Sequence, residues 1–103
     1  MRMLTERKSV SLAAGAYSFN TQRFNGQVMQ HVFVNALSTN TYDFSITNAD
    51  GDVVFSRTVT GDINEVDVGL PLLSIMTVAI ANATVAADPV VIYLVGNNGS
   101  DIS

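Results

Sequence analysis

Alternation of apolar and polar residues is the feature that most restricts how this chain can fold. The clearest example is the segment 42–46, in which the apolar residues Tyr42, Phe44 and Ile46 are separated by single polar residues. Successive side chains of a β-strand point to opposite faces of the sheet. The pattern therefore predicts a strand with one face buried and the other in solvent.

A β-hairpin is expected to follow from this strand. The next residues are Asn48-Ala49-Asp50-Gly51-Asp52, and Asn, Asp and Gly are the residue types that favour turns. Beyond the turn, Val53, Phe55 and Val59 continue the apolar face on the return strand. Facing apolar and aromatic pairs contribute a few tenths to about 1 kcal/mol each to such a hairpin.

The same two-residue period extends over most of the chain, and no long segment has the 3.6-residue period of a helix. Asn25-Gly26 favours a turn, and Gly69-Leu70-Pro71 predicts a corner with the proline at a strand start or sheet edge. The resulting strands are expected over residues 4–12, 17–19, 27–37, 42–46, 53–59, 63–68, 73–81 and 90–95.

Two of these strands are expected to be central. Both faces of 27–37 are largely apolar, so we expect this strand to be covered on both sides. The segment 90–95 is a nearly continuous β-rich run that ends at Gly96. The segment 73–81 predicts a buried strand with Met76, Val78 and Ile80 in the core.

Seven or eight short strands with short connections predict an all-β fold, an antiparallel β-sandwich or barrel of the jelly-roll or Ig-like kind. A length of 103 residues fits one domain. We expect residues 1–12 to form an N-terminal strand or extended arm, residues 13–96 the β-sandwich domain, and residues 97–103 a polar tail.

The composition favours a protein that is covered by partners. Hydrophobic residues make up 48% of the chain and charged residues only 14%, whereas soluble domains average roughly 25% charged residues. Charge is also unevenly placed: residues 1–23 hold four basic residues and one acid (+3), and residues 24–103 hold one basic residue and eight acids (−7). The basic segment of one copy could therefore approach the acidic body of another.

The residue inventory argues against catalysis and against a cofactor. There is no cysteine, and the one histidine, His31, lies in the middle of a predicted strand among apolar neighbours. A zinc site needs several nitrogen or sulfur ligands, and a catalytic triad needs a base presented beside a nucleophile. Asn48, Asp50 and Asp52 alternate as calcium ligands do, but the glycine spacing and the glutamate of an EF-hand loop are missing. We expect no enzyme activity, no cofactor and no metal site, and a calcium-binding turn remains an alternative.

Membrane and nucleic-acid partners are not expected. Residues 68–87 lack charge over a membrane-spanning length, but polar residues and a proline interrupt them and their apolar residues alternate. The N-terminal segment has no apolar core of the kind found in signal peptides. Basic residues are too few and too scattered for a nucleic-acid surface.

The segment from Tyr42 to Val95 resembles small virion proteins encoded among the head genes of tailed bacteriophages. The resemblance covers about half of the chain and consists of strands and turns, not of a catalytic signature. Its residues are Tyr42-Asp43-Phe44-Ser45-Ile46, Asp50-Gly51-Asp52-Val53-Val54-Phe55, Thr60-Gly61, Leu70-Pro71-Leu72, Thr77-Val78-Ala79-Ile80-Ala81-Asn82-Ala83-Thr84 and Val91-Ile92-Tyr93-Leu94-Val95.

The resemblance implies a β-sandwich or barrel module in the virion that decorates or cements the capsid. The alternatives are a head–tail junction or tail or fibre component, and a carbohydrate- or receptor-binding module. The implied partners are the major capsid protein or other virion proteins, in a homo-oligomer for which a trimer is one option. The assembly surface is expected to involve Arg2, Leu4, Arg7, Lys8 and Val10.

Overall fold

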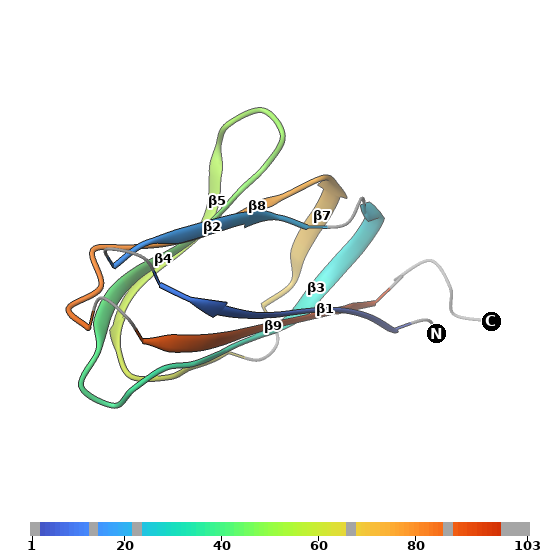
Figure 1. Cartoon of the computed structure of the whole chain (residues 1–103). Coiled ribbons are helices and arrows are strands. Elements are labelled where there is room, and N and C mark those ends of the chain that lie inside the picture. The colour runs from blue at the N-terminus through green and yellow to red at the C-terminus, as the bar shows by residue number, and fades with distance from the viewer. Residues whose placement is uncertain (1–2, 13–14, 22–23, 66–67, 86–87, 98–103) are drawn as a thin grey trace.

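The computed structural model describes residues 3–12, 15–21, 24–65, 68–85 and 88–97, and every regular element in these ranges is a β-strand. Figure 1 shows them in two stacked layers, with the β4–β5 turn projecting beyond the body. The strands are β1 (Met3–Ser11), β2 (Tyr17–Asn20), β3 (Phe24–Asn35), β4 (Thr41–Thr47), β5 (Val53–Thr60), β6 (Ile63–Glu65), β7 (Leu70–Ser74), β8 (Thr77–Ala81) and β9 (Pro89–Asn97).

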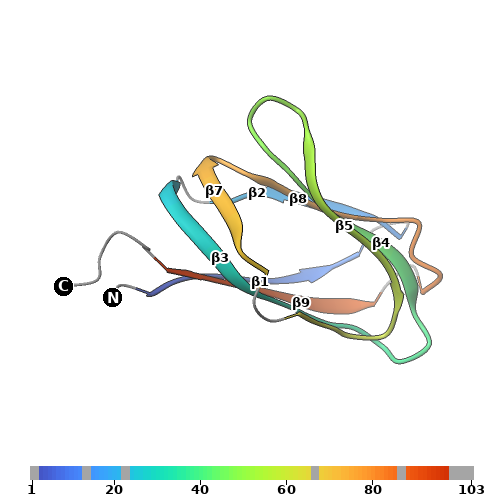
Figure 2. The same ribbon diagram turned by 180° about the vertical axis from the view of Figure 1, so that it is seen from behind.

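The strands form two antiparallel sheets. The larger sheet has the order β1-β9-β3-β6, and β7 also pairs with β3; the smaller sheet has the order β2-β8-β4-β5. β6 pairs with residues 32–34 of β3 and β7 with residues 24–29, so together they occupy one interrupted edge position. Figure 2 shows the same two layers from behind. The predicted β-sandwich is confirmed.

The connections are those of a jelly roll. If β6 and β7 count as one interrupted strand, the pairs are nested: β1 with β9, β2 with β8, β3 with β6 and β7, and β4 with β5. The nested pairs form one long antiparallel ribbon. This ribbon is folded back on itself, so that β3 also pairs with β9 and β4 with β8. Two sheets formed in this way are the double Greek key of the jelly roll.

The core lies between the sheets and contains the residues that alternation predicted. Phe44 and Ile46 of β4 are fully buried, and Phe44 meets Phe55 of β5 edge to face at 6.0 Å between ring centroids. From the larger sheet, Val34 and Ile92 are buried in the same core cluster. Burial of a large apolar side chain stabilises the fold by about 1.5–3 kcal/mol, so these facing layers drive folding.

The described residues form nine strands where seven or eight were predicted, because residues 73–81 do not form one strand. Residues 70–74 pair with β3 in the larger sheet, and residues 77–81 pair with β4 and β2 in the smaller one. The chain therefore changes sheets at Ile75 and Met76. The backbone of Met76 is held there by Thr21, through Thr21 N–H to the Met76 carbonyl (2.8 Å) and Met76 N–H to Thr21 Oγ1 (3.0 Å).

Strict alternation over residues 27–37 would place Met29 on the face opposite Val32 and Val34, and the structure differs at this end of the strand. The register of β3 shifts between Met29 and His31 against β9, which is a bulge, so Met29 points to the core together with Val32 and Val34. A second irregularity, against β7, lies between Asn25 and Gln27, where a turn was predicted. A bulge adds one residue to a strand and reverses the alternation beyond it.

A similar irregularity corrects the prediction for Val53. The β4–β5 register shifts between Ile46 and Thr47, so Phe55 pairs with Ile46 and Val53 with Thr47. Phe55 is buried as predicted, whereas Val53 is 61% exposed. β9 also continues past Gly96, the predicted end, to Asn97.

Each open side of the sandwich is bridged by a basic side chain. At the β1–β2 side, Lys8 Nζ lies 5.5 Å from the ring centroid of Phe19. At the β5–β6 side, Arg57 binds both carboxylate oxygens of Glu65, at 2.8 and 3.1 Å, and lies over the ring of Phe55. These contacts join the edges of the two sheets.

In the described ranges no helix is present that is long and apolar enough to cross a membrane.

Candidate functional site

The outer faces of the two sheets differ in chemistry. On the smaller sheet, alternate residues of β4 (Thr41, Asp43, Ser45 and Thr47) are polar and point away from the core. Asp43 accepts hydrogen bonds from the Asn82 side-chain amide at 2.8 Å and from the Thr58 hydroxyl at 2.6 Å. The Asn82 bond, followed by the Thr58 bond, lowers the pKa of Asp43. This face is polar and internally hydrogen-bonded.

The outer face of the larger sheet carries rings at its centre. Arg7, Tyr93, Phe33 and Asn64 are register partners on four neighbouring strands and form one row across the sheet. Tyr93 and Phe33 are half-buried, with ring centroids 6.4 Å apart, whereas Arg7 and Asn64 at the ends of the row are exposed. Side chains of paired residues on the same face lie close enough to act together.

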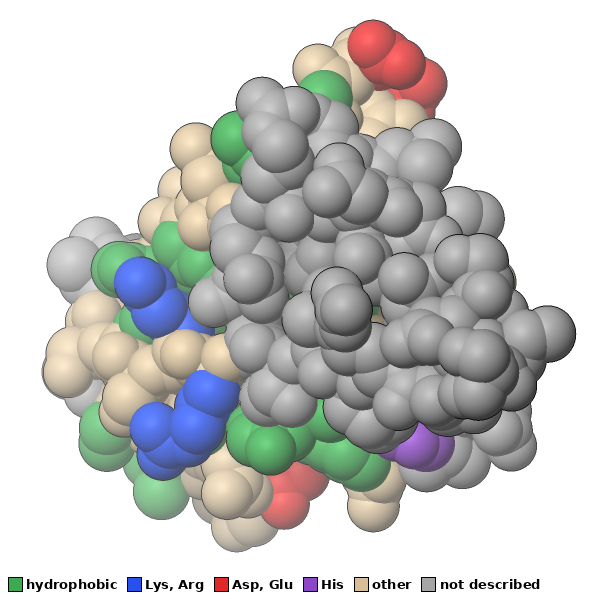
Figure 3. Space-filling model, turned by 90° about the vertical axis from the view of Figure 1, so that its right-hand side faces the viewer, with side chains coloured by type: hydrophobic (Ala, Val, Ile, Leu, Met, Phe, Trp, Pro, Cys, Tyr) green, Lys and Arg blue, Asp and Glu red, His purple; other side chains and the backbone are tan. Residues whose placement is uncertain are grey.

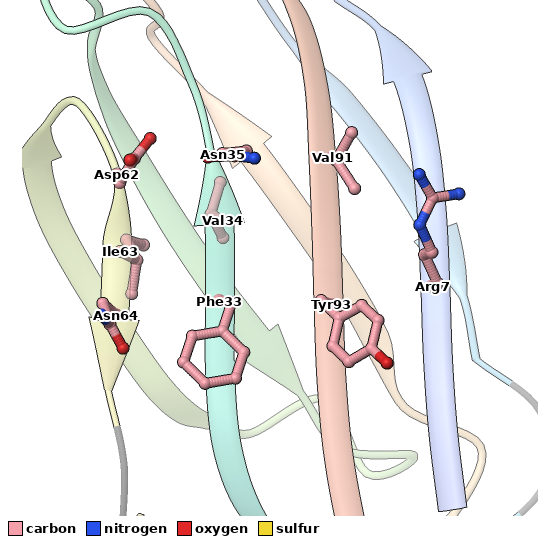
Figure 4. A pocket seen from close by; sticks show the side chains of 9 residues that line it. All are labelled: Arg7, Phe33, Val34, Asn35, Asp62, Ile63, Asn64, Val91 and Tyr93. Atoms are coloured by element: carbon pink, nitrogen blue, oxygen red, sulfur yellow. The ribbon is translucent and has the colours of Figure 1, made fainter.

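A hollow of about 460 Å³ lies over this row. Figure 4 shows Phe33 and Tyr93 side by side on β3 and β9, with Asp62, Asn35 and Val91 in the adjacent row. We refer to this hollow as the aromatic hollow. Its volume falls within the range of about 300–1,000 Å³ that is usual for small-molecule sites.

Most polar groups around the aromatic hollow are unpaired among the residues that the structure describes. Within the described part of the chain, the side chains of Arg7, Asn35 and Asn64 and the hydroxyl of Tyr93 have no hydrogen-bond partner. Asp62 is the exception, because its Oδ1 accepts the backbone N–H of Ala36 at 2.9 Å. That bond orients the carboxylate and leaves Oδ2 available.

His31 lies beside the same row, on the outer face of β3. Its ring stacks on Phe33 at 5.7 Å with an interplanar angle of 20°, and its Nδ1 is buried without a hydrogen-bond partner among the described residues. The covering layer predicted for this side of β3 is not formed by any described element. No group of three or more metal-binding side chains occurs in the ranges that the structure describes.

The Asn48–Asp52 segment, the alternative calcium site, forms a tight turn. Asn48 Oδ1 accepts the backbone N–H groups of Asp50 and Asp52, both at 3.0 Å. Gly51 has a φ of 89°, a conformation that glycine adopts without steric cost. The side chain of Asn48 therefore stabilises the backbone of its own turn.

A buried polar cluster that the sequence did not reveal lies at one end of the sandwich. Asp88 Oδ2 accepts the Asn40 side-chain amide at 2.8 Å and the Leu37 N–H at 2.9 Å. Tyr42 donates its hydroxyl to the Gly61 carbonyl at 2.6 Å. Burial, followed by the charges of Asp62 and Asp88, raises the pKa of Tyr42 to about 12. Each of these groups is satisfied within the fold, so the cluster acts as a structural clamp.

The predicted assembly residues do not share one surface. Residues 3–11 form strand β1 within the larger sheet, so of the two alternatives for residues 1–12 the structure has the strand. Arg7 is exposed on the outer face, whereas Lys8 points toward Phe19 and Val10 is buried in the core. Val10 is therefore not available to a partner in this fold.

The remaining predictions for the termini lie largely outside the described parts of the chain. Arg2 is not among the described residues, and for Leu4 the structure describes the strand but not the side chain. Of the predicted tail, Asn97 belongs to β9, and residues 98–103 lie outside the described ranges.

Comparison with known proteins identifies no family. No protein-family model matches the chain, and no curated protein matches its sequence. Among solved structures, a chain of the structure of infectious bursal disease virus, Gx strain, aligns with a TM-score of 0.37 and 13% sequence identity. The alignment covers 98% of this chain and 33% of that chain, so this chain spans about one third of that protein's length. A match this weak carries no argument about function.

Proposed function

We propose that this chain is a non-enzymatic structural protein of the virion, a decoration or cement protein on the head of a tailed bacteriophage. The observation that carries the proposal is the exposed edge of β1. This nine-residue strand pairs with β9 on one side, and no described strand pairs with its other side. An unpaired strand edge is a template for a strand of another chain.

The charges on β1 favour selective pairing. Glu6, Arg7 and Lys8 lie in the middle of this strand, and charged residues on an edge oppose indiscriminate pairing. Residues 24–103 carry a net charge of −7 (one basic residue and eight acids). The basic segment of one copy is therefore attracted to the acidic body of a neighbour or to an acidic site on the shell.

The fold and the resemblance support the proposal at different levels. Jelly rolls occur in capsid proteins, lectins and cupins alike, so the fold by itself does not select a function. The likeness of residues 42–95 to head-gene products directs the proposal to the tailed-phage head. The partners are then the major capsid protein and further copies of this chain.

The test is binding to phage particles. Light scattering after size-exclusion chromatography measures the number of copies in solution, and cosedimentation with purified heads measures attachment. We expect an oligomer that attaches to heads. Attachment to tails but not heads would favour the tail or junction alternatives, and a monomer that binds neither would refute the proposal.

Point variants probe β1 better than a deletion, because removing residues 1–12 would remove an edge strand and the buried side chains of Val10 and Leu12. Arg7→Gln removes one positive charge from the strand. Ala49→Glu at the exposed hairpin tip changes the net charge by the same amount and serves as the control. We expect Arg7→Gln to weaken head binding and Ala49→Glu to leave it unchanged.

A further inference from the structure

The aromatic hollow combines rings with hydrogen-bonding groups that have no partner among the described residues, which is the combination that a sugar requires. We infer that this hollow binds an uncharged carbohydrate, with one sugar ring packed against Phe33 and Tyr93. The inference goes beyond the proposed structural role. It concerns the face of the larger sheet, whereas attachment to the particle uses the edge of β1. Arg7 contributes to both, so the variants that test the sugar site leave Arg7 unchanged.

The rings supply the apolar part of the site. A pyranose presents C–H groups on one face, and these pack against the electron-rich face of an aromatic ring. Phe33 and Tyr93 are half-buried neighbours whose planes differ by 48°. His31 stacks on Phe33 and holds that ring in place. His31 is therefore a positioning residue and not a direct contact.

The surrounding groups supply the polar part. Sugar hydroxyls both donate and accept hydrogen bonds, so a sugar site needs donors and acceptors together. Asn35 and Asn64 offer both, Arg7 offers donors, and Asp62 Oδ2 offers an acceptor that the bond from Ala36 to Oδ1 holds in position. Figure 4 shows these residues on the same side of the sheet as the two rings.

The charge distribution favours an uncharged ligand. The aromatic hollow contains one guanidinium, Arg7 on β1, and one carboxylate, Asp62, directly before β6. Opposite charges at its two sides give no net preference for an anion or a cation. Figure 3 shows that basic side chains gather on one part of the visible surface and that acidic groups occur at its upper and lower margins.

The site is open on one side, so we expect weak binding, with a dissociation constant on the order of 1 mM. The test is titration of the isotope-labelled protein, followed by NMR, with two probes: a trisaccharide of glucose and a trisaccharide of N-acetylglucosamine. We expect at least one probe to shift the amide side-chain signals of Asn35 and Asn64 and the ring signals of Tyr93. Shifts confined to other residues, or none with either probe, would overturn the inference.

Two variants separate binding from folding. Tyr93→Ala should weaken binding of the active probe at least tenfold, and Asn64→Ala, an exposed change that leaves the rings intact, should weaken it about threefold or more. The control is Tyr17→Ala, which removes a half-buried ring that packs against the core. Unchanged binding in both hollow variants would overturn the inference even if those proteins are folded.

Self-association is a distinct outcome of the same experiment. If the signals of Tyr93 and Asn64 move with protein concentration and sugars have no effect, the face is covered by a second copy and the inference is wrong. Tyr93→Ala should still attach to phage heads, because β1 is intact. Failure of sugar binding therefore leaves the proposed virion role standing, and failure of head binding leaves the sugar site standing.

Discussion

The carboxylate of Asp88 accepts a 2.8 Å hydrogen bond from the side-chain amide of Asn40, 48 residues earlier in the chain, and both side chains are buried. The pair joins the loop before β4 to the start of β9, one of the two inner strands of the larger sheet. Buried polar groups cost free energy unless they are paired. The clamp therefore makes the position of β9 depend on a distant loop.

Removal of the Asp88 carboxylate should destabilise the fold. Asp88→Ala leaves the buried Asn40 amide and the part-buried Leu37 N–H without their acceptor, and we expect a loss of about 2–3 kcal/mol in the free energy of unfolding. Urea denaturation measures the loss. Asp50→Ala in the exposed hairpin turn is the matched control and should change stability by less than about 0.5 kcal/mol. Equal effects of the two variants would contradict the structural role of the clamp.

The raised pKa of Tyr42 predicts that the folded protein loses stability at alkaline pH. Its pKa is about 12 in the folded protein, against about 10 for an unfolded tyrosine. Between these values the folded state keeps a proton that the unfolded state releases. The contribution of the protonated Tyr42 hydroxyl to the free energy of unfolding is therefore complete below pH 10. It is lost as the pH rises toward 12, by up to about 1.4 kcal/mol per pH unit.

Tyr42→Phe tests this prediction, because phenylalanine has no titrating hydroxyl. At pH 7 the variant loses the bond to the Gly61 carbonyl and should be less stable by about 1–2 kcal/mol. Urea midpoints measured from pH 8 to pH 11.5 should converge for the two proteins. Parallel curves over that range would refute the assignment.

The irregular pairing of the β4–β5 hairpin predicts a large loss of stability when one apolar residue is truncated and a small loss for another. Phe55→Ala removes a buried ring and should cost about 3–4 kcal/mol. Val53→Ala changes a side chain that is 61% exposed and should cost less than about 1 kcal/mol. Thermal or chemical unfolding of both variants provides the measurement. A large loss at Val53 would show that the strand keeps the regular alternation instead.

A comparison of Gly15 with Gly51 tests whether the backbone of Ala83 lies close to Gly15. Both have a positive φ, 79° and 89°, so alanine is strained at either position. A Cβ at Gly15 would also lie 2.9 Å from the Ala83 carbonyl oxygen, whereas one at Gly51 meets nothing within 4 Å. We expect Gly51→Ala to cost about 1 kcal/mol and Gly15→Ala clearly more. Equal losses would mean that the loop at Ala83 moves freely.

Local pattern was sufficient to predict the hairpin and most of the core. The alternation of Tyr42, Phe44 and Ile46 reports which face is buried, because each strand contributes every second residue to the core. The same reasoning was insufficient at Met29 and Val53, where an extra residue in one strand changes the phase. A bulge depends on the partner strand and has little signal in its own residues.

The aromatic hollow could not be predicted from the alternation of residues within single strands, for a related reason. Arg7, Phe33, Asn64 and Tyr93 come from four strands spread over most of the chain, and only the sheet order makes them neighbours. Phe33 and Tyr93 give no signal of their own, because an aromatic residue at a strand position is compatible with either face. The buried clamp at Asp88 likewise depends on a loop contact that no periodicity encodes.

The place of β9 in the larger sheet has a consequence for synthesis of the protein. β1 and β3 lie on either side of β9, so β1 finds its neighbour only after β9, some 80 residues later in the chain, has been made. Folds that depend on such distant pairings form slowly. The nascent chain must therefore carry β1 without its neighbour until β9 has been made. During that interval the charges of Glu6, Arg7 and Lys8 oppose premature pairing between chains.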